Sequence, residues 1–216
     1  MTGPHFASKV TTFAGGRSIE EAGRAVVYLH GRGGSARDIL SLAVQMSPAD
    51  AVSVAPTAAG HTWYPFSFLA PIEQNQPGID SAHGLIERIL ADLGSAGIPS
   101  SSTALVGFSQ GACLATDHAL RFPRRYGAVV GLTGGLIGPP GFVFEPSGSL
   151  HGTPVLLASG DRDPHVPWER VVETECVLRR MGAEVTLLRY PDAPHAVLPE
   201  QVVKARELLE RMEKAR

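Results

Sequence analysis

Thr103-Ala-Leu-Val-Gly-Phe-Ser-Gln-Gly111 is the stretch of this 216-residue chain that tells most about its fold. Its apolar first half is typical of a buried parallel strand, and residues 112–120 after it suit a helix. Ser109 would then occupy the turn between that strand and that helix. Because Gly107 and Gly111 lack a β-carbon, the chain can turn sharply and the helix can pack close to the strand. The stretch therefore predicts an exposed serine hydroxyl at the carboxyl edge of a parallel sheet.

The pattern around this stretch predicts a mostly parallel central sheet with helices on both faces. We expect strands at 24–30, 51–55, 103–108, 127–132, 154–159 and 184–190, and helices at 38–45, 81–93, 111–121, 168–181 and 199–214. Alternating strands and helices favour parallel pairing with right-handed crossovers. One or two antiparallel edge strands are expected within residues 8–19. The length suits a single domain, 1–216, without a large lid.

A serine hydroxyl is a weak nucleophile, so it needs a base that takes its proton and an acid that orients the base. Asp161 and Asp163 both follow the strand at 154–159, in Gly160-Asp-Arg-Asp-Pro-His-Val-Pro167. His195 lies in the loop after the strand at 184–190. Serine, aspartate and histidine thus occur in the order that a nucleophile on such a strand-to-helix turn requires, each after a strand.

An oxyanion hole is expected from the loop after an early strand. The strand at 24–30 runs into the glycine-rich segment Gly31-Arg-Gly-Gly34. The two donors would be the backbone amides of Arg32 and Gln110, so the side chains at both positions are expected to be secondary. We expect His30 to order this loop by hydrogen bonding.

Four motifs together resemble the phospholipase/carboxylesterase family of α/β-hydrolases, which includes small bacterial carboxylesterases and acyl-protein thioesterases. They are His-Gly-x-Gly at 30–33, Gly-Phe-Ser-Gln-Gly at 107–111, Gly-x-x-Asp-x-x-Val-Pro at 160–167 and the loop of His195. The resemblance implies Ser109 as nucleophile, Asp163 as acid and His195 as base, with the amides of Arg32 and Gln110 as oxyanion donors. Asp161 is then interpreted as a turn residue that bonds its own backbone.

Two long connections, 56–79 and 133–152, are expected to border the site, because long loops in compact domains are often functional. Aromatic and aliphatic side chains of these loops and of the Asp163 loop are predicted to line a substrate pocket: Trp63, Phe66, Phe68, Leu69, Leu136, Ile137 and Val166. Eukaryotic thioesterases of the family usually carry an apolar and then an acidic residue after His-Gly, where this chain has Arg32 and Gly34. That difference argues against a long lipid tail beside this loop.

Composition narrows the classes of partner. The formal net charge of −2 gives no electrostatic reason to expect nucleic acid or an anionic membrane. We see neither a secretory leader nor a membrane-spanning run, and so expect a cytoplasmic protein. Cys113 and Cys176 both fall in predicted helices and are expected to be reduced core thiols. Asp161, Asp163 and His165 make a poor metal site, and no metal or organic cofactor is expected.

The expected function is a serine carboxylesterase that hydrolyses small-molecule esters of short to medium acyl chains through an acyl-enzyme. An acyl-protein thioesterase or lysophospholipase-like activity would use the same residues and stays open. A non-catalytic binding protein on a hydrolase fold is the third alternative, and the intact Ser109, Asp163 and His195 argue against it. Neither the physiological substrate nor the oligomeric state, a homodimer included, follows from the sequence.

Overall fold

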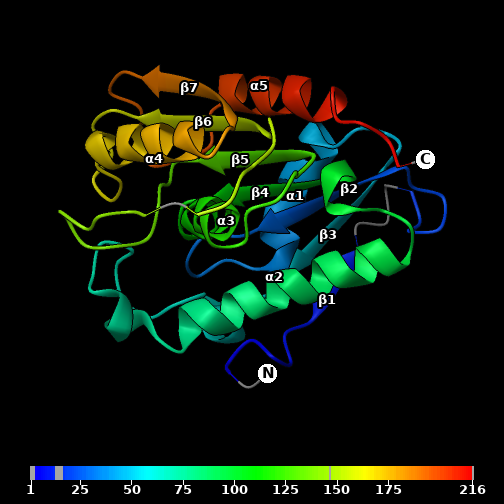
Figure 1. Ribbon diagram of the computed structural model, residues 1–216, viewed down its shortest axis with the longest axis horizontal. Helices are drawn as coiled ribbons and strands as arrows, with labels where there is room; N and C mark the ends of the chain where they lie inside the picture. The colour runs from blue at the N-terminus through cyan, green and yellow to red at the C-terminus, as the bar shows by residue number, and fades with distance from the viewer. Residues whose placement is uncertain (1–2, 13–16, 146, 216) are drawn as a thin grey trace.

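The computed structural model describes residues 3–12, 17–145 and 147–215. Within them the strands form one seven-stranded sheet in the order β1-β3-β2-β4-β5-β6-β7 (Figure 1). The strands are β1 (Val10–Thr12), β2 (Arg24–Leu29), β3 (Ala51–Pro56), β4 (Thr103–Phe108), β5 (Ala128–Leu132), β6 (Pro154–Gly160) and β7 (Glu184–Tyr190). All neighbours pair in parallel except β1 and β3. The predicted mostly parallel sheet is confirmed.

Five α-helices alternate with these strands along the described chain. They are α1 (Ala36–Met46), α2 (Gly78–Ser95), α3 (Gln110–Arg121), α4 (Trp168–Arg180) and α5 (Pro199–Glu210). Short 3₁₀ turns lie at Ala59–His61, Ile72–Asn75 and Ser100–Ser102. No helix of the described residues has both the length and the apolar character needed to cross a bilayer.

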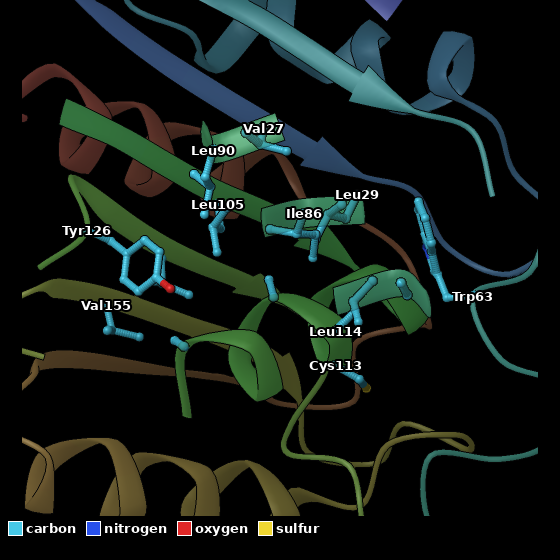
Figure 2. Close-up of a cluster of buried hydrophobic side chains, with 14 of the residues drawn as sticks. Val27, Leu29, Trp63, Ile86, Leu90, Leu105, Cys113, Leu114, Tyr126 and Val155 are labelled. Atoms are coloured by element: carbon cyan, nitrogen blue, oxygen red, sulfur yellow. The ribbon is translucent and has the colours of Figure 1, made fainter. Parts of the chain in front are cut away.

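The two faces of the sheet carry separate hydrophobic cores. Side chains of α2, α3 and α4 pack with one set of strand residues, and side chains of α1 and α5 pack with the alternate set. Figure 2 shows the first core, where Ile86 and Leu90 of α2 lie beside Val27 and Leu105 of the sheet. Strands β2 to β5 are covered on both faces, which explains their nearly unbroken apolar sequences.

The amino-terminal edge of the sheet carries one antiparallel strand, within the one or two expected for residues 8–19. Among the described residues a single strand forms there, β1, antiparallel to β3. Residues 13–16 of the predicted edge lie outside the described residues. The edge therefore adds one antiparallel strand to an otherwise parallel sheet.

Helix α5 ends at Glu210, four positions before the predicted end at residue 214. Arg24, at the start of β2, donates from Nη1 to the carbonyl oxygens of Glu210 (2.9 Å) and Met212 (3.2 Å). The same guanidinium pairs with Asp50. A buried cation that binds the last carbonyls of a helix satisfies groups that have no intrahelical donor. The helix ends where Arg24 binds it. The apolar spacing of α5 does not reveal this contact.

The two cysteines differ in their surroundings. Cys113 is buried on α3, as expected for a core thiol, but Cys176 on α4 is exposed, and that expectation is wrong. The inward face of α4 is formed by Thr174, Val177 and Leu178. Residue 176 falls between these positions on the helix and so points away from the sheet.

Candidate active site

Ser109, Asp163 and His195 follow β4, β6 and β7 and meet at the carboxyl edge of the sheet. His195 Nε2 lies 2.8 Å from Ser109 Oγ, and His195 Nδ1 lies 2.6 Å from Asp163 Oδ2. The carboxylate can only accept, so Nδ1 carries a proton and Nε2 is left to accept the serine proton. The structure thus brings the three predicted residues into one hydrogen-bonded chain.

Asp163 is fixed by its own loop. The carboxylate is buried, and its Oδ1 accepts the backbone N–H groups of His165 at 2.8 Å and Val166 at 2.9 Å. The other oxygen faces His195. Because both oxygens have partners, the carboxylate holds one orientation toward the imidazole.

Ser109 sits on a sharp backbone turn, with φ 54° and ψ −118°. A non-glycine residue with positive φ is uncommon, and the surrounding structure must hold it there. A β-carbon on Gly107 would lie 2.1 Å from the carbonyl oxygen of Gly111, and one on Gly111 would lie 2.0 Å from that of Leu29. Both positions therefore require glycine, which is the reason for the Gly-x-Ser-x-Gly pattern.

Asp161 makes its main bonds to β7 and the loop after it. Its Oδ1 accepts the backbone N–H of Asp192 at 2.9 Å, and its Oδ2 binds the Arg189 guanidinium. A weaker bond to its own backbone N–H fits the expected turn role, but the stronger partner is the amide in the loop after β7. The Asp192 amide also holds the pKa of Asp161 below its ordinary value. Asp161 thus ties the loop of Asp163 to the loop of His195.

The glycine-rich loop after β2 lies directly against Ser109. A β-carbon on Gly31 would be 3.5 Å from Cβ of Ser109. His30 orders the loop as expected: its Nδ1 bonds the carbonyl of Gly31 at 2.7 Å, and its Nε2 accepts the backbone N–H of Ala58 at 3.0 Å. Burial lowers the pKa of His30, so the neutral tautomer with Nδ1–H fits this pair of bonds.

Two backbone amides are free to face a developing oxyanion. The N–H of Gln110 belongs to the first turn of α3, where amides have no intrahelical acceptor. The N–H of Arg32 has no backbone acceptor among the described residues. Arg32 follows Gly31, which lies against Ser109, and Gln110 directly follows Ser109.

The side chain of Gln110 is more than secondary, contrary to expectation. Its Oε1 accepts the backbone N–H of Trp63 at 3.0 Å and the hydroxyl of Thr62 at 3.2 Å, and its Nε2 donates to the carbonyl of Tyr64 at 2.8 Å. These bonds fasten the connection between β3 and α2 to the turn that carries Ser109. Gln110, directly after Ser109, therefore also positions the wall of the site.

Replacing Gln110 with leucine is expected to lower the free energy of unfolding by about 1–3 kcal/mol, because the buried amide of Trp63 loses its acceptor. Urea denaturation followed by tryptophan fluorescence measures this. Gln45→Leu, at an exposed position on α1, is the matched control and should change stability by less than about 0.5 kcal/mol. Equal midpoints for the two variants would show that the bonds of Gln110 carry no net stability.

A cavity of about 620 Å³ opens beside Ser109. Its lining comes from the glycine-rich loop after β2, the connection between β3 and α2, the start of α3 and the turns after β4, β6 and β7: Gly31, Arg32, Tyr64, Pro65, Phe66, Ser67, Phe68, Phe108, Ser109, Gln110, Cys113, His165, Val166 and His195. Predicted pocket residues Phe66, Phe68 and Val166 belong to this lining. A volume of this size is typical of sites for small molecules.

Four predicted pocket residues do not line this cavity. Trp63 is fully buried, and its indole N–H donates to the carbonyl of His30 at 2.8 Å, so it supports the start of the glycine-rich loop after β2. Leu69, Leu136 and Ile137 pack in the hydrophobic cores. They are apolar residues of long loops, and their sequence does not distinguish a cavity wall from a core contact.

No described residue of the long connection 133–152 lines the cavity either. It backs the cavity wall instead, where the N–H of Gly138 donates to the carbonyl of Phe68 at 2.9 Å. Arg170 of α4 holds this segment by donating to the carbonyl oxygens of Leu136 and Gly138. Of the two long connections, 56–79 borders the site and 133–152 supports it.

Several lining residues were missed by the sequence analysis. Cys113 is one helical turn after Ser109 on α3, a spacing that could have placed it on the same face. Burial raises the pKa of its thiol to about 12, so it stays protonated. His165 is exposed, and its ring lies 4.9 Å from the ring of His195. Among the described residues, no three metal-binding side chains cluster at a distance suited to a metal ion.

Comparison with known proteins places this geometry in a family. Residues 16–213 match the family model described as phospholipase/carboxylesterase. Acyl-protein thioesterase 1 from Gibberella zeae is 30% identical over 122 residues, which cover 56% of this chain and 50% of that protein. Acyl-protein thioesterase 1 from Yarrowia lipolytica is 26% identical over 155 residues, 64% of this chain and 68% of that protein. The match thus spans only about half the length of the Gibberella relative.

Solved structures give longer matches. A phospholipase/carboxylesterase from Dyadobacter fermentans superposes with a TM-score of 0.91 at 38% identity, covering 97% of this chain and 99% of that one. Esterase PE8 superposes with a TM-score of 0.79 at 27% identity, covering 95% and 99%. The sheet of this protein is accordingly that of an α/β-hydrolase, and the chain belongs to the phospholipase/carboxylesterase family.

Proposed function

We propose that this protein is a serine carboxylesterase that hydrolyses small-molecule esters through an acyl-enzyme. The observation that carries the proposal is the chain of hydrogen bonds from Ser109 Oγ through His195 to Asp163, with distances of 2.8 and 2.6 Å. Serine, imidazole and carboxylate in this arrangement activate the hydroxyl for attack on a carbonyl carbon. Family membership supports the same chemistry.

Each group then has a defined role. Ser109 Oγ attacks the ester carbonyl while its proton passes to His195 Nε2, and Asp163 stabilises the resulting imidazolium without taking its proton. The amides of Arg32 and Gln110 donate to the oxyanion of the tetrahedral intermediate. His195 next gives its proton to the leaving alcohol, which leaves an acyl group on Ser109. A water molecule, deprotonated by His195, releases the acid and restores the serine.

A fluorophosphonate probe tests the proposal at the nucleophile. The probe phosphonylates only an activated serine, and so a single adduct on the peptide that contains Ser109 is expected by mass spectrometry. Prior incubation with an excess of 4-nitrophenyl butyrate should slow labelling, because both reagents compete for one hydroxyl. A protein that hydrolyses no ester and leaves the probe unreacted would instead be a hydrolase fold used for binding.

Acyl-chain length should affect activity only until the cavity is filled. Each methylene buried against Phe66 and Phe68 contributes about 0.8 kcal/mol, or roughly fourfold in kcat/KM. Chain carbons that extend past the cavity into solvent add nothing. For 4-nitrophenyl esters we expect kcat/KM to rise from acetyl to butyryl or hexanoyl and to level off or fall before palmitoyl. A continued rise through palmitoyl would contradict the short-to-medium assignment.

A thioesterase activity is the second candidate, favoured by the relatives from Gibberella and Yarrowia that are named acyl-protein thioesterase 1. The same three residues would act, so only the substrate differs. Ethyl butanoate and S-ethyl thiobutanoate form a matched pair for this comparison. The kcat/KM for the thioester is divided by that for the ester, and the same ratio is taken for their alkaline hydrolysis. An enzymatic ratio larger than the alkaline one would assign the protein to thioesters.

A further inference from the structure

The cavity beside Ser109 carries one permanent charge. Among its described lining residues Arg32 is the only arginine or lysine, and none is an aspartate or glutamate. The remaining polar lining groups are neutral hydroxyls, an amide, a thiol and the two imidazoles of His165 and His195. The cavity therefore presents an excess of positive charge to its contents.

The Arg32 guanidinium is held in place by uncharged partners. Nη1 donates to the hydroxyl of Thr62 at 3.0 Å and the carbonyl of Pro65 at 2.8 Å, and Nη2 donates to the carbonyl of Phe66 at 2.6 Å. A guanidinium has five N–H groups, so these bonds leave the Nε–H and one Nη2–H over. Neither has an acceptor among the described residues, and no described carboxylate pairs with Arg32.

The acidic side chains on the neighbouring loops are already paired. Asp163 is bound by His195 and two amides, and Asp161 is bound by Arg189 and the amide of Asp192. Asp192 in turn pairs with Arg162 at 3.0 Å. The charge of Arg32 is consequently left for a ligand.

We propose that Arg32 makes this site selective for esters that carry a carboxylate group, a specificity that rests on the proposed esterase function. Two spare N–H groups on adjacent nitrogens of an immobilised guanidinium suit a carboxylate, which accepts two parallel hydrogen bonds. Ordering the guanidinium costs no further entropy, because three bonds already hold it. Half-esters of short dicarboxylic acids are the substrate class that combines this group with a scissile ester.

The position of Arg32 sets how close the carboxylate lies to the reacting bond. Its backbone amide is the proposed oxyanion donor, and its side chain bonds Thr62, Pro65 and Phe66, the last two of which line the cavity. One residue thus spans from the scissile carbonyl to the carboxylate. Succinate, glutarate and adipate half-esters differ in this spacing and bracket the reach of one arginine side chain.

The experiment compares charged and neutral esters of equal length by pH-stat titration. Monoethyl succinate, glutarate and adipate are paired with ethyl butanoate, pentanoate and hexanoate, and the ratio of kcat/KM within each pair is measured for wild type and Arg32→Gln. Because Arg32 also belongs to the oxyanion loop, a general loss of activity cancels in this ratio. For the best spacing we expect the ratio to fall about 1.5- to 5-fold in Arg32→Gln, the range for a solvent-accessible ion pair.

Arg162→Gln is the matched control, since Arg162 is an exposed arginine near the site that does not line the cavity. It should leave the ratio unchanged. In wild type, 0.5 M NaCl should lower the ratio, a readout that requires no variant. Butanoyl glycolate carries its carboxylate in the alcohol part. The ratio of its kcat/KM to that of ethyl butanoate tests whether the charge binds on the leaving-group side.

The outcomes separate the two proposals. If the neutral esters are hydrolysed but the ratios depend on neither Arg32 nor salt, in both the acyl and the leaving-group series, the carboxylate specificity is overturned. The esterase proposal is then unaffected. Failure to hydrolyse any of the esters would overturn the esterase proposal on which it rests. A ratio that drops equally in Arg162→Gln would overturn the assignment to Arg32 in favour of general surface charge.

Discussion

Replacing Ser109 with alanine is expected to lower kcat on 4-nitrophenyl butyrate by about 10⁴- to 10⁶-fold, the range found when a triad nucleophile is removed. The reason is that His195 then has no hydroxyl to deprotonate, so the covalent path is lost and only the oxyanion donors remain. The backbone at Ser109 is set by the glycines around it and not by the hydroxyl, so the fold should be kept. Stopped-assay kinetics and urea denaturation on the same preparation measure both properties.

Ser41→Ala supplies the control for this loss of a hydroxyl. Ser41 is an exposed residue of α1 on the opposite core from α3, and its hydroxyl bonds only the carbonyl of Asp38. The esterase activity of Ser41→Ala should equal that of wild type. If Ser109→Ala retained more than about one per cent of wild-type kcat, a triad mechanism through this serine would have to be abandoned.

Replacing Gly111 with alanine is expected to have the largest effect on stability, a loss of about 3 kcal/mol or more. The new β-carbon would lie 2.0 Å from the carbonyl oxygen of Leu29, 2.5 Å from its carbon and 2.7 Å from the carbonyl oxygen of His30. All three atoms are backbone at the end of β2, so no side chain can move aside. Either α3 or the glycine-rich loop after β2 must shift, and activity should fall along with stability.

Gly94→Ala is the matched control for this substitution. Gly94 lies inside α2, and a β-carbon there meets no atom within 4 Å. Because alanine favours the helix over glycine, this variant should gain about 0.5–1 kcal/mol. Urea midpoints for the two variants should therefore move in opposite directions. A Gly111→Ala protein as stable and active as wild type would show that the close contact between α3 and β2 is not required.

The fold class followed from local pattern because each interior strand is buried on both faces. Runs such as Ala104-Leu-Val106 and Val155-Leu-Leu157 are apolar without alternation, and only a sheet covered on both sides needs that. Parallel strands end at a common edge, so residues that follow β4, β6 and β7 had to lie near one another. The meeting of Ser109, Asp163 and His195 is thus a consequence of topology that the sequence already contains.

The wall of the cavity did not follow in the same way. Trp63 and Tyr64 are neighbours in an irregular loop, yet Trp63 supports the glycine-rich loop after β2 while Tyr64 belongs to the cavity lining. Leu136 and Ile137 are as apolar as Phe68 but are buried in the cores. Without a helical or strand period, the direction of a side chain depends on contacts with distant segments.

Polar contacts between distant segments were equally invisible. The side chain of Gln110 meets residues 62–64, and Asp161 meets the loop after β7. On the far side of α3, His118 is buried against Glu87 of α2, and burial lowers its pKa to about 4. Each of these residues looks like an ordinary polar residue in the sequence, because its partner is 31 to 48 positions away.

Short-range pattern was enough for the parallel sheet, the glycine-framed turn of Ser109 and the order of the three reacting residues, because these depend on burial period, on the absence of a β-carbon and on strand order. The shape and charge of the cavity depend on how the connection 56–79 folds against α3 and on which side chains pin it there. Those contacts form only once the chain has packed, since each partner lies dozens of residues from the other. The residues proposed for the reaction can therefore be predicted from the sequence, whereas substrate selection at Ser109 depends on how the loops around it pack.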